Sequence, residues 1–555
     1  MIAEFSQYAI MKNLTSLKDL YIWLYNTWKG YKLQTIINIT IGILIVLTDL
    51  AFVWGTKLCI DIATHSNSQW NLKSAITILA VLLIMQLLLS YANKWIKATL
   101  GAKSTCQMQK DNYRHLLQCD WTALKQYHSG DLLNRLEKDI DSIVIFLTES
   151  IPSLLTTLAR LAGAFLLLYA MSKALALIII IICPLFLIIS KLYIKKTRKL
   201  THEIRATESE IQTIIQEGLQ HITVLKTFEK TLWATDTLNE TQEKLKKGIR
   251  NKTKYSSISS LTMNFGFSAG YIVTFTWGVI NLENGTITYG ALIAFMQLIG
   301  QIQAPIRNLS RYIPIFINAF TASERIIEVQ RIEQEKLLHK PQLKGDVGIE
   351  FKNVTFQYHK EHPIFENFSY NFPPHSKTAI IGETGKGKTT LIRLMLSLLH
   401  PQQGSIDIYN NTTRLSLTNL SRNNFSYVPQ GNTLLNGTIR SNLIIGNEYA
   451  TDTDMQNALA AACANFVFNS EKGLDTPCGE RGNGLSEGQA QRISIARALL
   501  KPCSILIMDE ATSSLDEETE KKIIKNITDL YPLKTIIFIT HRPEILKYCT
   551  RILHL

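Results

Sequence analysis

Long apolar runs fill the first 320 residues of this chain, and no run of that length follows them. Six are long enough to cross a bilayer core, which takes roughly 20 helical residues. They lie at 33–57, 74–93, 143–171, 173–194, 260–281 and 288–317. The third and fourth runs meet at Ser172, which predicts a tight hairpin. The sequence therefore predicts an all-α membrane domain of six long helices, followed by a soluble half.

Positive charge accompanies the apolar runs and gives the domain an orientation. The segment 93–142 carries eight Lys or Arg and 190–256 is also basic, whereas the loop 281–290 has none. Cytoplasmic loops carry an excess of Lys and Arg, so the basic loops and both termini are expected in the cytoplasm. The net charge of +13 thus indicates membrane loops, and we expect no nucleic-acid partner. The eight cysteines form no C-x-x-C pair, so we expect thiols rather than a disulfide framework.

Helices of this chain are free to continue beyond the membrane. No proline precedes Pro152, and none lies between Pro184 and Pro305, so nothing forces a break there. From Ala92 to Tyr127 a helix would extend roughly 50 Å, well into the cytosol. We expect two helical stalks with short turns near 127–141 and 217–230. Ordinary helices of a loop domain are the alternative.

A few polar side chains lie inside the predicted spans. Ionisable and polar groups at membrane depth are costly, and they are candidates for lining a cavity. Asp49 and Arg160 have opposite charges and can pair across helices, unless Asp49 lies at the outer interface. The full set is Asn38, Asp49, Gln86, Arg160, Gln297 and Gln301.

A glycine-rich loop opens the soluble half. GETGKGKTT (382–390) follows the strand-like TAIIG and precedes a helical run, and its spacing fits G-x-x-x-x-G-K-[ST]. The glycines let backbone N–H groups face phosphates, Lys388 reaches the β- and γ-phosphates, and Thr389 ligates Mg²⁺. This predicts an α/β P-loop NTPase domain that binds ATP and Mg²⁺. The residues expected at the nucleotide are Gly382, Glu383, Thr384, Gly385, Lys386, Gly387, Lys388, Thr389 and Thr390.

Two carboxylates end the apolar strand SILIMDE (504–510). Asp509 is expected to hold Mg²⁺, and Glu510 is expected to be the base that deprotonates the attacking water. His541, at the end of IIFITH, is a third candidate and would reach the γ-phosphate. Apolar strands often end in an acid, so this pattern gains its weight from the P-loop about 120 residues upstream.

LSEGQAQRISIARALL (485–500) resembles the signature motif of ATP-binding cassette (ABC) proteins. Tyr358 matches the family's adenine-stacking position and Gln430 its Q-loop, a further Mg²⁺ and water contact. SSLD (513–516) matches the D-loop, which places Asp516 at the nucleotide. The membrane half resembles that of ABC exporters through SGDLLNRLEKDID (129–141). The resemblance implies an exporter-type membrane domain fused to one cassette.

The family resemblance also implies a domain layout and a partner. We expect an N-terminal cytoplasmic segment at 1–32, the transmembrane domain at 33–322, a linker at 323–346 and the cassette at 347–555. A half-transporter of this kind works as a dimer in which two cassettes enclose two ATP molecules. Each site would take Ser486, Gly488 and Gln489 from the partner subunit.

Two residues depart from the family pattern. Glu487 stands where the signature usually has its first glycine, and Lys386 where the P-loop commonly has serine. A carboxylate near the partner's γ-phosphate weakens the site unless the side chain points away. A homodimer and a heterodimer with one partly degenerate site therefore both stay open. The printed sequence ends after a strand, where cassettes of this family usually continue, which bears on regulation rather than catalysis.

The sequence predicts ATP-driven export of a hydrophobic or amphipathic cargo, a drug, lipid or peptide, across the inner (plasma) membrane of a bacterium, with the ATPase domain in the cytoplasm. A soluble cassette ATPase of translation or DNA repair is excluded by the six spans. An exporter-shaped importer remains an alternative, because the fold does not fix the direction of transport. Adaptable apolar cavities say little about cargo.

Overall fold

The computed structural model describes residues 17–66, 70–309, 311–335, 343, 345–358, 363–383, 385–479 and 484–555. The side chains of 180–195, 198 and 307 lie outside this description. The chain forms two compact units. The first joins Met1–Tyr113 to Gly130–Val329, and the second joins Arg114–Ser129 to Gln330–Leu555.

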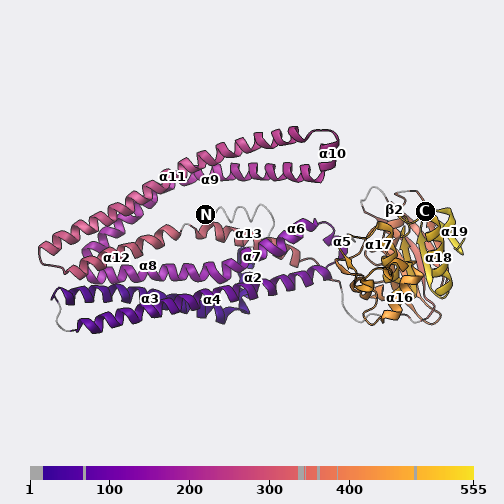
Figure 1. Cartoon of the computed structure of the whole chain (residues 1–555), viewed down its shortest axis with the longest axis horizontal. Helices are drawn as coiled ribbons and strands as arrows, with labels where there is room; N and C mark the ends of the chain where they lie inside the picture. The colour runs from indigo at the N-terminus through magenta and orange to yellow at the C-terminus, as the bar shows by residue number, and fades with distance from the viewer. Residues whose placement is uncertain are drawn as a thin grey trace. The chain divides into compact units, whose positions relative to one another are not determined.

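The first unit is built from helices alone within its described residues (Figure 1). In chain order they are α2 (Leu17–Lys29), α3 (Lys32–Ala63), α4 (Leu72–Gln118, whose end belongs to the second unit), α6 (Ser129–Asn134), η1 (Arg135–Asp139), α7 (Ile140–Ile145), η2 (Phe146–Ser150), α8 (Ile151–Met171), α9 (Lys173–Gln220), α10 (Ile222–Thr227), α11 (Thr231–Glu283), α12 (Tyr289–Leu309) and α13 (Tyr312–Gln330).

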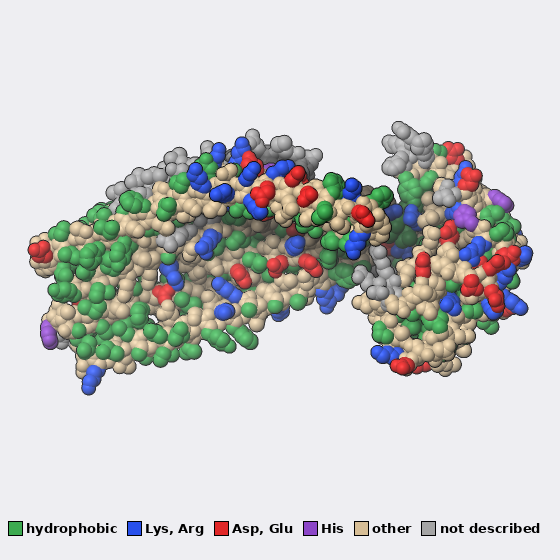
Figure 2. Space-filling view, turned by 45° about the horizontal axis from the view of Figure 1, so that its top comes forward, with side chains coloured by type: hydrophobic (Ala, Val, Ile, Leu, Met, Phe, Trp, Pro, Cys, Tyr) green, Lys and Arg blue, Asp and Glu red, His purple; other side chains and the backbone are tan. Residues whose placement is uncertain are grey.

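Four helical stretches within the described residues are long and apolar enough to cross a membrane: Lys32–Ala63, Leu72–Gln118, Ser129–Met171 and Thr231–Glu283. They contain four of the predicted spans. The predicted span 173–194 lies in α9, but most of its side chains are outside the description. Neighbouring side chains of α4 such as Leu87 and Leu88 are more than 60% exposed, as suits a lipid-facing surface. Figure 2 shows hydrophobic side chains concentrated toward one end of this helical unit and charged ones toward the other.

The predicted span 288–317 is not one helix. Helix α12 ends at Leu309 and α13 begins at Tyr312, with the turn Arg311 N–H to Asn308 O (3.0 Å) between them. Residue 310 lies outside the described residues. Pro314 lies in the first turn of α13, where its missing N–H leaves no helical hydrogen bond unmade. The predicted span therefore covers α12 and the start of α13.

The stalks predicted from the lack of proline are present as helices. Helix α4 runs for 47 residues, α9 for 48 and α11 for 53. Ser172 ends α8 and caps α9, accepting a hydrogen bond from the Leu175 N–H (3.4 Å), which forms the predicted hairpin. Short helix α10 links α9 to α11, and these two helices lie side by side (Figure 1).

An ionic cluster joins the base of the third span to the last helix of the unit. Arg135 is buried and bonds to Asp131 (2.8 Å), Glu328 (2.8 Å) and the Arg325 carbonyl (2.7 Å). Arg325 in turn pairs with Asp131 and with Asp139 (3.1 Å). Since α13 leads directly to the second unit, this cluster fixes the helix from which the linker departs.

The second unit contains the nucleotide half and the tip of the first stalk. Its strands are β1 (Gly348–Gln357), β2 (Pro363–Phe372), β3 (Lys377–Ile381), β4 (Gln403–Tyr409), β5 (Arg414–Ser416), β6 (Phe425–Val428), β7 (Gly437–Thr438), β8 (Pro477–Cys478), β9 (Ile505–Asp509), β10 (Thr535–Ile539) and β11 (Arg551–His554). Its helices are α5 (Trp121–Leu124), α14 (Lys388–Met395), η3 (Asn419–Asn424), α15 (Ile439–Ile444), α16 (Asp452–Ala461), η4 (Asn465–Val467), η5 (Gly473–Asp475), α17 (Glu487–Leu500), α18 (Glu517–Leu530) and α19 (Pro543–Leu546).

Two main sheets organise this unit. An antiparallel sheet has the order β2-β1-β4-β5, and a parallel sheet has the order β11-β3-β10-β9-β6. In the parallel sheet Ile539 lies opposite both Ile380 and Asp509, so β3, β10 and β9 end at one edge. Ligands bind beyond the carboxyl ends of such strands. This edge is where the predicted P-loop, carboxylates and histidine emerge.

Candidate nucleotide-binding site

The P-loop follows β3 and leads into α14. Gly385 and Gly387 have φ values of +91° and +92°, which a residue with a side chain adopts only under strain. A Cβ on Gly387 would also lie 2.6 Å from Ile364 Cγ2. The buried Lys388 ammonium donates to the carbonyls of Gly382 (2.6 Å) and Glu383 (3.1 Å). The loop thus holds a desolvated positive charge at the start of a helix, where phosphates bind.

The other P-loop residues differ in their surroundings. Thr390 is buried, whereas Glu383, Lys386 and Thr389 are exposed. The exposed Thr389 hydroxyl is free to face a ligand from the first turn of α14. Predicted Thr384 lies outside the described residues.

Asp509 ends β9 as a buried carboxylate at the sheet edge. The Tyr427 hydroxyl donates to its Oδ2 (3.2 Å). Burial raises the pKa of Asp509, and the hydrogen bond from Tyr427 opposes that rise. Oxygen ligands are what Mg²⁺ prefers, usually one or two from protein together with substrate phosphates. The Asp509 carboxylate, the Thr389 hydroxyl and the Gln430 amide oxygen are oxygen donors of the kind that such a site uses.

Three predicted catalytic residues meet beside the lysine. Gln430 Nε2 donates to Glu510 Oε2 (2.7 Å), and His541 Nε2 lies 3.5 Å from Glu510 Oε1. His541 Nε2 is also 3.1 Å from Lys388 Nζ. Glu510 has φ +46°, a conformation rare for a residue with a side chain. Such backbone strain is common at functional sites.

Tyr358 is 44% exposed and contacts the first turn of α14. Its hydroxyl accepts from Arg393 Nη1 (3.1 Å) and lies 3.4 Å from Thr390 Oγ1. The same Arg393 guanidinium lies 5.2 Å from the centre of the Trp121 ring. Trp121 begins α5 at the tip of the first stalk, so one arginine contacts both the candidate adenine-stacking residue and the stalk tip.

The stalk tip is held against the nucleotide half by further contacts. Asp120 N–H donates to the Glu333 carbonyl (3.0 Å), and Glu335 N–H donates to the Gln118 carbonyl (2.7 Å). Arg422 binds both carboxylate oxygens of Glu335, at 2.6 and 2.8 Å. The segment after α13 therefore pairs with the stalk tip in a short extended bridge.

The signature residues form the start of α17. Ser486 caps the helix, with its Oγ accepting from Gln489 N–H (3.2 Å), while Gln489 Oε1 accepts from Ser486 N–H (2.9 Å). A Cβ on Gly488 would lie 3.0 Å from both the Ser514 carbonyl and Leu515 Cδ2. Glu487 is exposed in the first turn, where an acid suits the positive helix end. Its presence is therefore compatible with the local fold.

Predicted Asp516 caps α18 and accepts a hydrogen bond from the Thr519 N–H (2.9 Å). This backbone N–H lowers the pKa of the Asp516 carboxyl. Within the described residues, no hydrogen bond or ion pair links Ser486, Gly488, Gln489 or Asp516 to the P-loop. The structure thus brings the predicted residues together in two clusters, one around Lys388 and one around the start of α17.

Sequence reasoning missed residues that hold these clusters in place. Tyr427 bonds to Asp509, Arg393 contacts Tyr358, and Gln491 and Arg542 contact the segment 513–516. Arg542 directly follows His541 in the sequence, which was the one available signal. The others lie on ordinary strand and helix positions.

In the helical unit, Asp49 pairs with Arg160 as predicted, with Oδ2 2.6 Å from Nη2. Gln86 Nε2 donates to the other carboxylate oxygen (2.5 Å). Arg160 lines a cavity of about 260 Å³ between α3, α4, α8 and α12. Gln297 lines another of about 550 Å³ between α11 and α12. Asn38 instead donates to the Thr148 carbonyl (3.2 Å) from a buried position.

Comparisons with known proteins agree with this picture. The family model of the ABC transporter transmembrane region matches residues 35–306, and that of the ABC transporter cassette matches 365–513. The chain is 30% identical over 471 residues to the ABC transporter ATP-binding protein YknV of Bacillus subtilis, covering 83% of this chain and 77% of that protein. It is 28% identical to an ATP-dependent lipid A-core flippase of Yersinia pestis, covering 95% and 92%.

The fold has a counterpart among solved structures. A bacterial Atm1-family ABC exporter with ATP bound superposes with a TM-score of 0.77 at 21% identity, covering 94% of this chain and 93% of that one. Membrane domain and cassette thus occur fused in one chain, as in exporter half-transporters, and the cassette carries the family's ATP-binding fold. This chain belongs to the ABC transporter family and couples ATP hydrolysis to transport across a membrane.

Proposed function

We propose that the chain works as a dimeric half-transporter that exports a hydrophobic or amphipathic cargo. The observation that carries this proposal is the separation of the two clusters in the cassette. Lys388 places a positive charge at the P-loop, and within the described residues no hydrogen bond or ion pair joins the P-loop to the start of α17. The start of α17 is a separate, capped helix end that also suits an anion. A second cassette, turned head to tail, would bring the α17 start of one subunit to the P-loop of the other.

The residues of each completed site have distinct tasks. Backbone N–H groups after Gly385 and the Lys388 ammonium hold the phosphates, and Tyr358 stacks on adenine. Mg²⁺, when bound, supplies charge neutralisation on the phosphate oxygens, and Asp509, Thr389 and Gln430 would hold it.

The attack of water on the γ-phosphate needs a base and orienting groups. Glu510 accepts the proton of the attacking water, because its carboxylate lies at the sheet edge between Gln430 and His541, which orient it. Gln430 holds that carboxylate at 2.7 Å. His541 contacts both Glu510 and Lys388, so it would lie beside the γ-phosphate that Lys388 binds.

Arg393 gives the cassette a route to the membrane helices. It contacts Tyr358 and Trp121, and Trp121 lies just after the 47-residue α4. A movement of Tyr358 on nucleotide binding would therefore reach the stalk tip through the Arg393 side chain. We propose that this contact transmits part of the closure that reorients the cargo cavity.

We propose a homodimer over a heterodimer because of two charges. Lys386 lies exposed on the P-loop and Glu487 lies exposed at the start of α17. In the proposed dimer these elements face each other across the interface, so the carboxylate of one subunit meets the ammonium of the other. The two departures from the family pattern would then compensate each other.

The domain boundaries 1–32, 33–322, 323–346 and 347–555 and the placement in the bacterial inner membrane with the cassette in the cytoplasm are part of this proposal. The similarity to a lipid A-core flippase supports lipids among the cargo classes. A polar cavity with Arg160 and an apolar one beside Tyr271 and Phe275 offer room for an amphipathic molecule.

Transport direction is tested in inside-out membrane vesicles. For an exporter, added ATP drives accumulation of a fluorescent lipid or dye in the vesicle lumen, and the Glu510→Gln variant abolishes it. ATP-dependent loss of the same probe from preloaded vesicles would instead identify an importer.

A further inference from the structure

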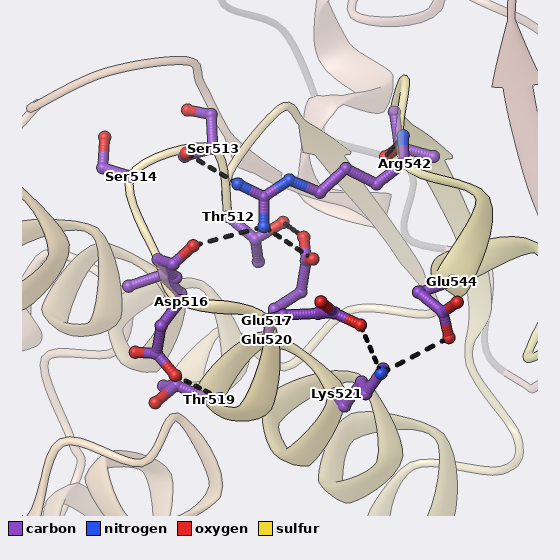
Figure 3. Close-up of polar contacts among 12 residues, drawn as sticks. Thr512, Ser513, Ser514, Asp516, Glu517, Thr519, Glu520, Lys521, Arg542 and Glu544 are labelled. Carbon is purple, nitrogen blue, oxygen red and sulfur yellow. Dashed lines mark hydrogen bonds and ion pairs between the residues drawn. The ribbon is translucent and has the colours of Figure 1, made fainter.

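Arg542 forms a clamp on the loop that follows Glu510. Its Nη2 donates to the Ser513 carbonyl (3.0 Å) and its Nη1 to the Leu515 carbonyl (3.2 Å). The same Nη1 pairs with Glu520 Oε2 (2.8 Å) on α18 (Figure 3). A single guanidinium thus holds both ends of the loop 513–516, using the fixed fork geometry that distinguishes arginine from lysine.

Glu520 makes this clamp specific. Its side chain is 1% exposed, and its other oxygen accepts from Thr512 Oγ1 (2.5 Å). A buried carboxylate needs a paired cation, and removing one partner leaves an uncompensated charge. Glu520 of α18 therefore fixes the position of the guanidinium, and the guanidinium in turn fixes the loop carbonyls.

The signature helix holds the same loop from the other side. Gln491 is 1% exposed; its Nε2 donates to Ser513 Oγ (3.3 Å) and its Oε1 accepts from the Ser514 N–H (3.2 Å). Gly488 of the same helix packs against the Ser514 carbonyl with no room for a Cβ without a shift. The loop 513–516 is thus clamped between α17 and Arg542.

Arg542 is the chain neighbour of the residue that faces the P-loop. His541 Nε2 lies 3.1 Å from Lys388 Nζ and 3.5 Å from Glu510, while the next side chain grips the loop. One short segment after β10 therefore touches the phosphate site on one side and the loop on the other.

We propose that Arg542 is a positioning residue that ties the loop 513–516 to the γ-phosphate site of its own subunit. This inference rests on the proposed dimer, in which the loop faces the partner's site. ATP on the P-loop would then set, through His541 and Arg542, the position of the loop that the partner subunit meets. A purely structural ion pair would stabilise the cassette without making the loop respond to nucleotide.

The test compares full-length chains in nanodiscs that carry Arg542→Lys, Arg542→Gln, or Arg542→Gln with Glu520→Gln. The double variant removes both charges together and so leaves no buried carboxylate unpaired if the single variant fails to fold. Lys521→Gln is the matched control, since Lys521 pairs with Glu517 and Glu544 at the surface beside the clamp (Figure 3).

Two readouts are taken. The first is hydrogen–deuterium exchange of the backbone amides in 511–520 with and without ATP, in a Glu510→Gln background. The second is kcat and KM for ATP, measured in chains that retain Glu510. We expect ATP to protect these amides in the parent chain and in Lys521→Gln, and the double variant to lose that protection. We also expect kcat of Arg542→Gln and of the double variant to fall by about 10- to 100-fold with little change in KM, as for a misplaced catalytic geometry. Arg542→Lys is expected to recover part of the lost kcat.

A double variant that keeps the ATP-dependent protection would overturn the inference. The exchange readout needs only ATP binding, so it decides the inference even if the parent chain does not hydrolyse ATP alone. Absence of parent hydrolysis would instead count against the proposed homodimer.

Discussion

Replacing Asn442 by leucine tests how firmly α15 holds the loop that follows Gln430. Asn442 is fully buried in α15. Its Oδ1 accepts from the Leu435 N–H (2.8 Å), and its Nδ2 donates to the carbonyls of Leu435 (2.9 Å) and Thr438 (3.0 Å). Leucine has nearly the same volume but makes none of these bonds, so the loop after Gln430 loses three tethers.

The magnitude follows from the number of hydrogen bonds. Each contributes about 1 kcal/mol net, so the loop is held less tightly by roughly 3 kcal/mol. Since about 1.4 kcal/mol is a factor of ten, local opening becomes about 100-fold more frequent. We expect amide exchange in 431–442 to accelerate by that factor, while exchange in the core strands β9 and β10 stays unchanged.

Hydrogen–deuterium exchange with mass spectrometry measures this directly. Asn447→Leu is the matched control, because the Asn447 side chain makes one hydrogen bond among the described residues, accepting from the Tyr449 N–H (3.1 Å) in a turn. Exchange in 431–442 that is no faster in Asn442→Leu than in Asn447→Leu would show that these three bonds do not hold the loop.

Three further outcomes are expected. Lys388→Met removes a charge-assisted contact of about 1.5–3 kcal/mol, so binding of a fluorescent ATP analogue should weaken about 10- to 100-fold; unchanged affinity would contradict the assigned role. Tyr427→Phe removes the bond that holds down the burial-raised pKa of Asp509, so more carboxyl is protonated at each pH and the acid limb of Mg²⁺-dependent ATPase should move to higher pH; a shift to lower pH would oppose this sign. Lys386→Glu and Glu487→Lys should each lower ATPase activity and their combination restore it, and failure of the combination would argue against their pairing in a homodimer.

The sequence was informative where a local pattern has one structural meaning. Strand, glycine-rich loop and helix placed Lys388 at the sheet edge, because only that order lets the backbone curl around phosphate. The absence of proline predicted the long α4 and α11, and opposite charges in two apolar runs predicted the pair of Asp49 with Arg160.

Other features depend on contacts between distant segments and carry no local signal. Arg542 acts on backbone carbonyls of residues 513 and 515, and any residue type supplies a carbonyl. Tyr427 meets Asp509 only because β6 and β9 pair in parallel. The boundary between α12 and α13 falls in a run whose hydrophobicity is continuous, so an apolar count alone overlooks it.

In the proposed homodimer, two copies of this chain form complete ATP sites. The steady-state ATPase activity of the chain purified alone in nanodiscs, beside Glu510→Gln, tests this. We expect steady hydrolysis by the parent chain, and retained ATP binding with hydrolysis lowered by about 10²- to 10⁴-fold in the variant. A well-folded parent chain that binds ATP but does not hydrolyse it would contradict the homodimer and point to a different partner subunit.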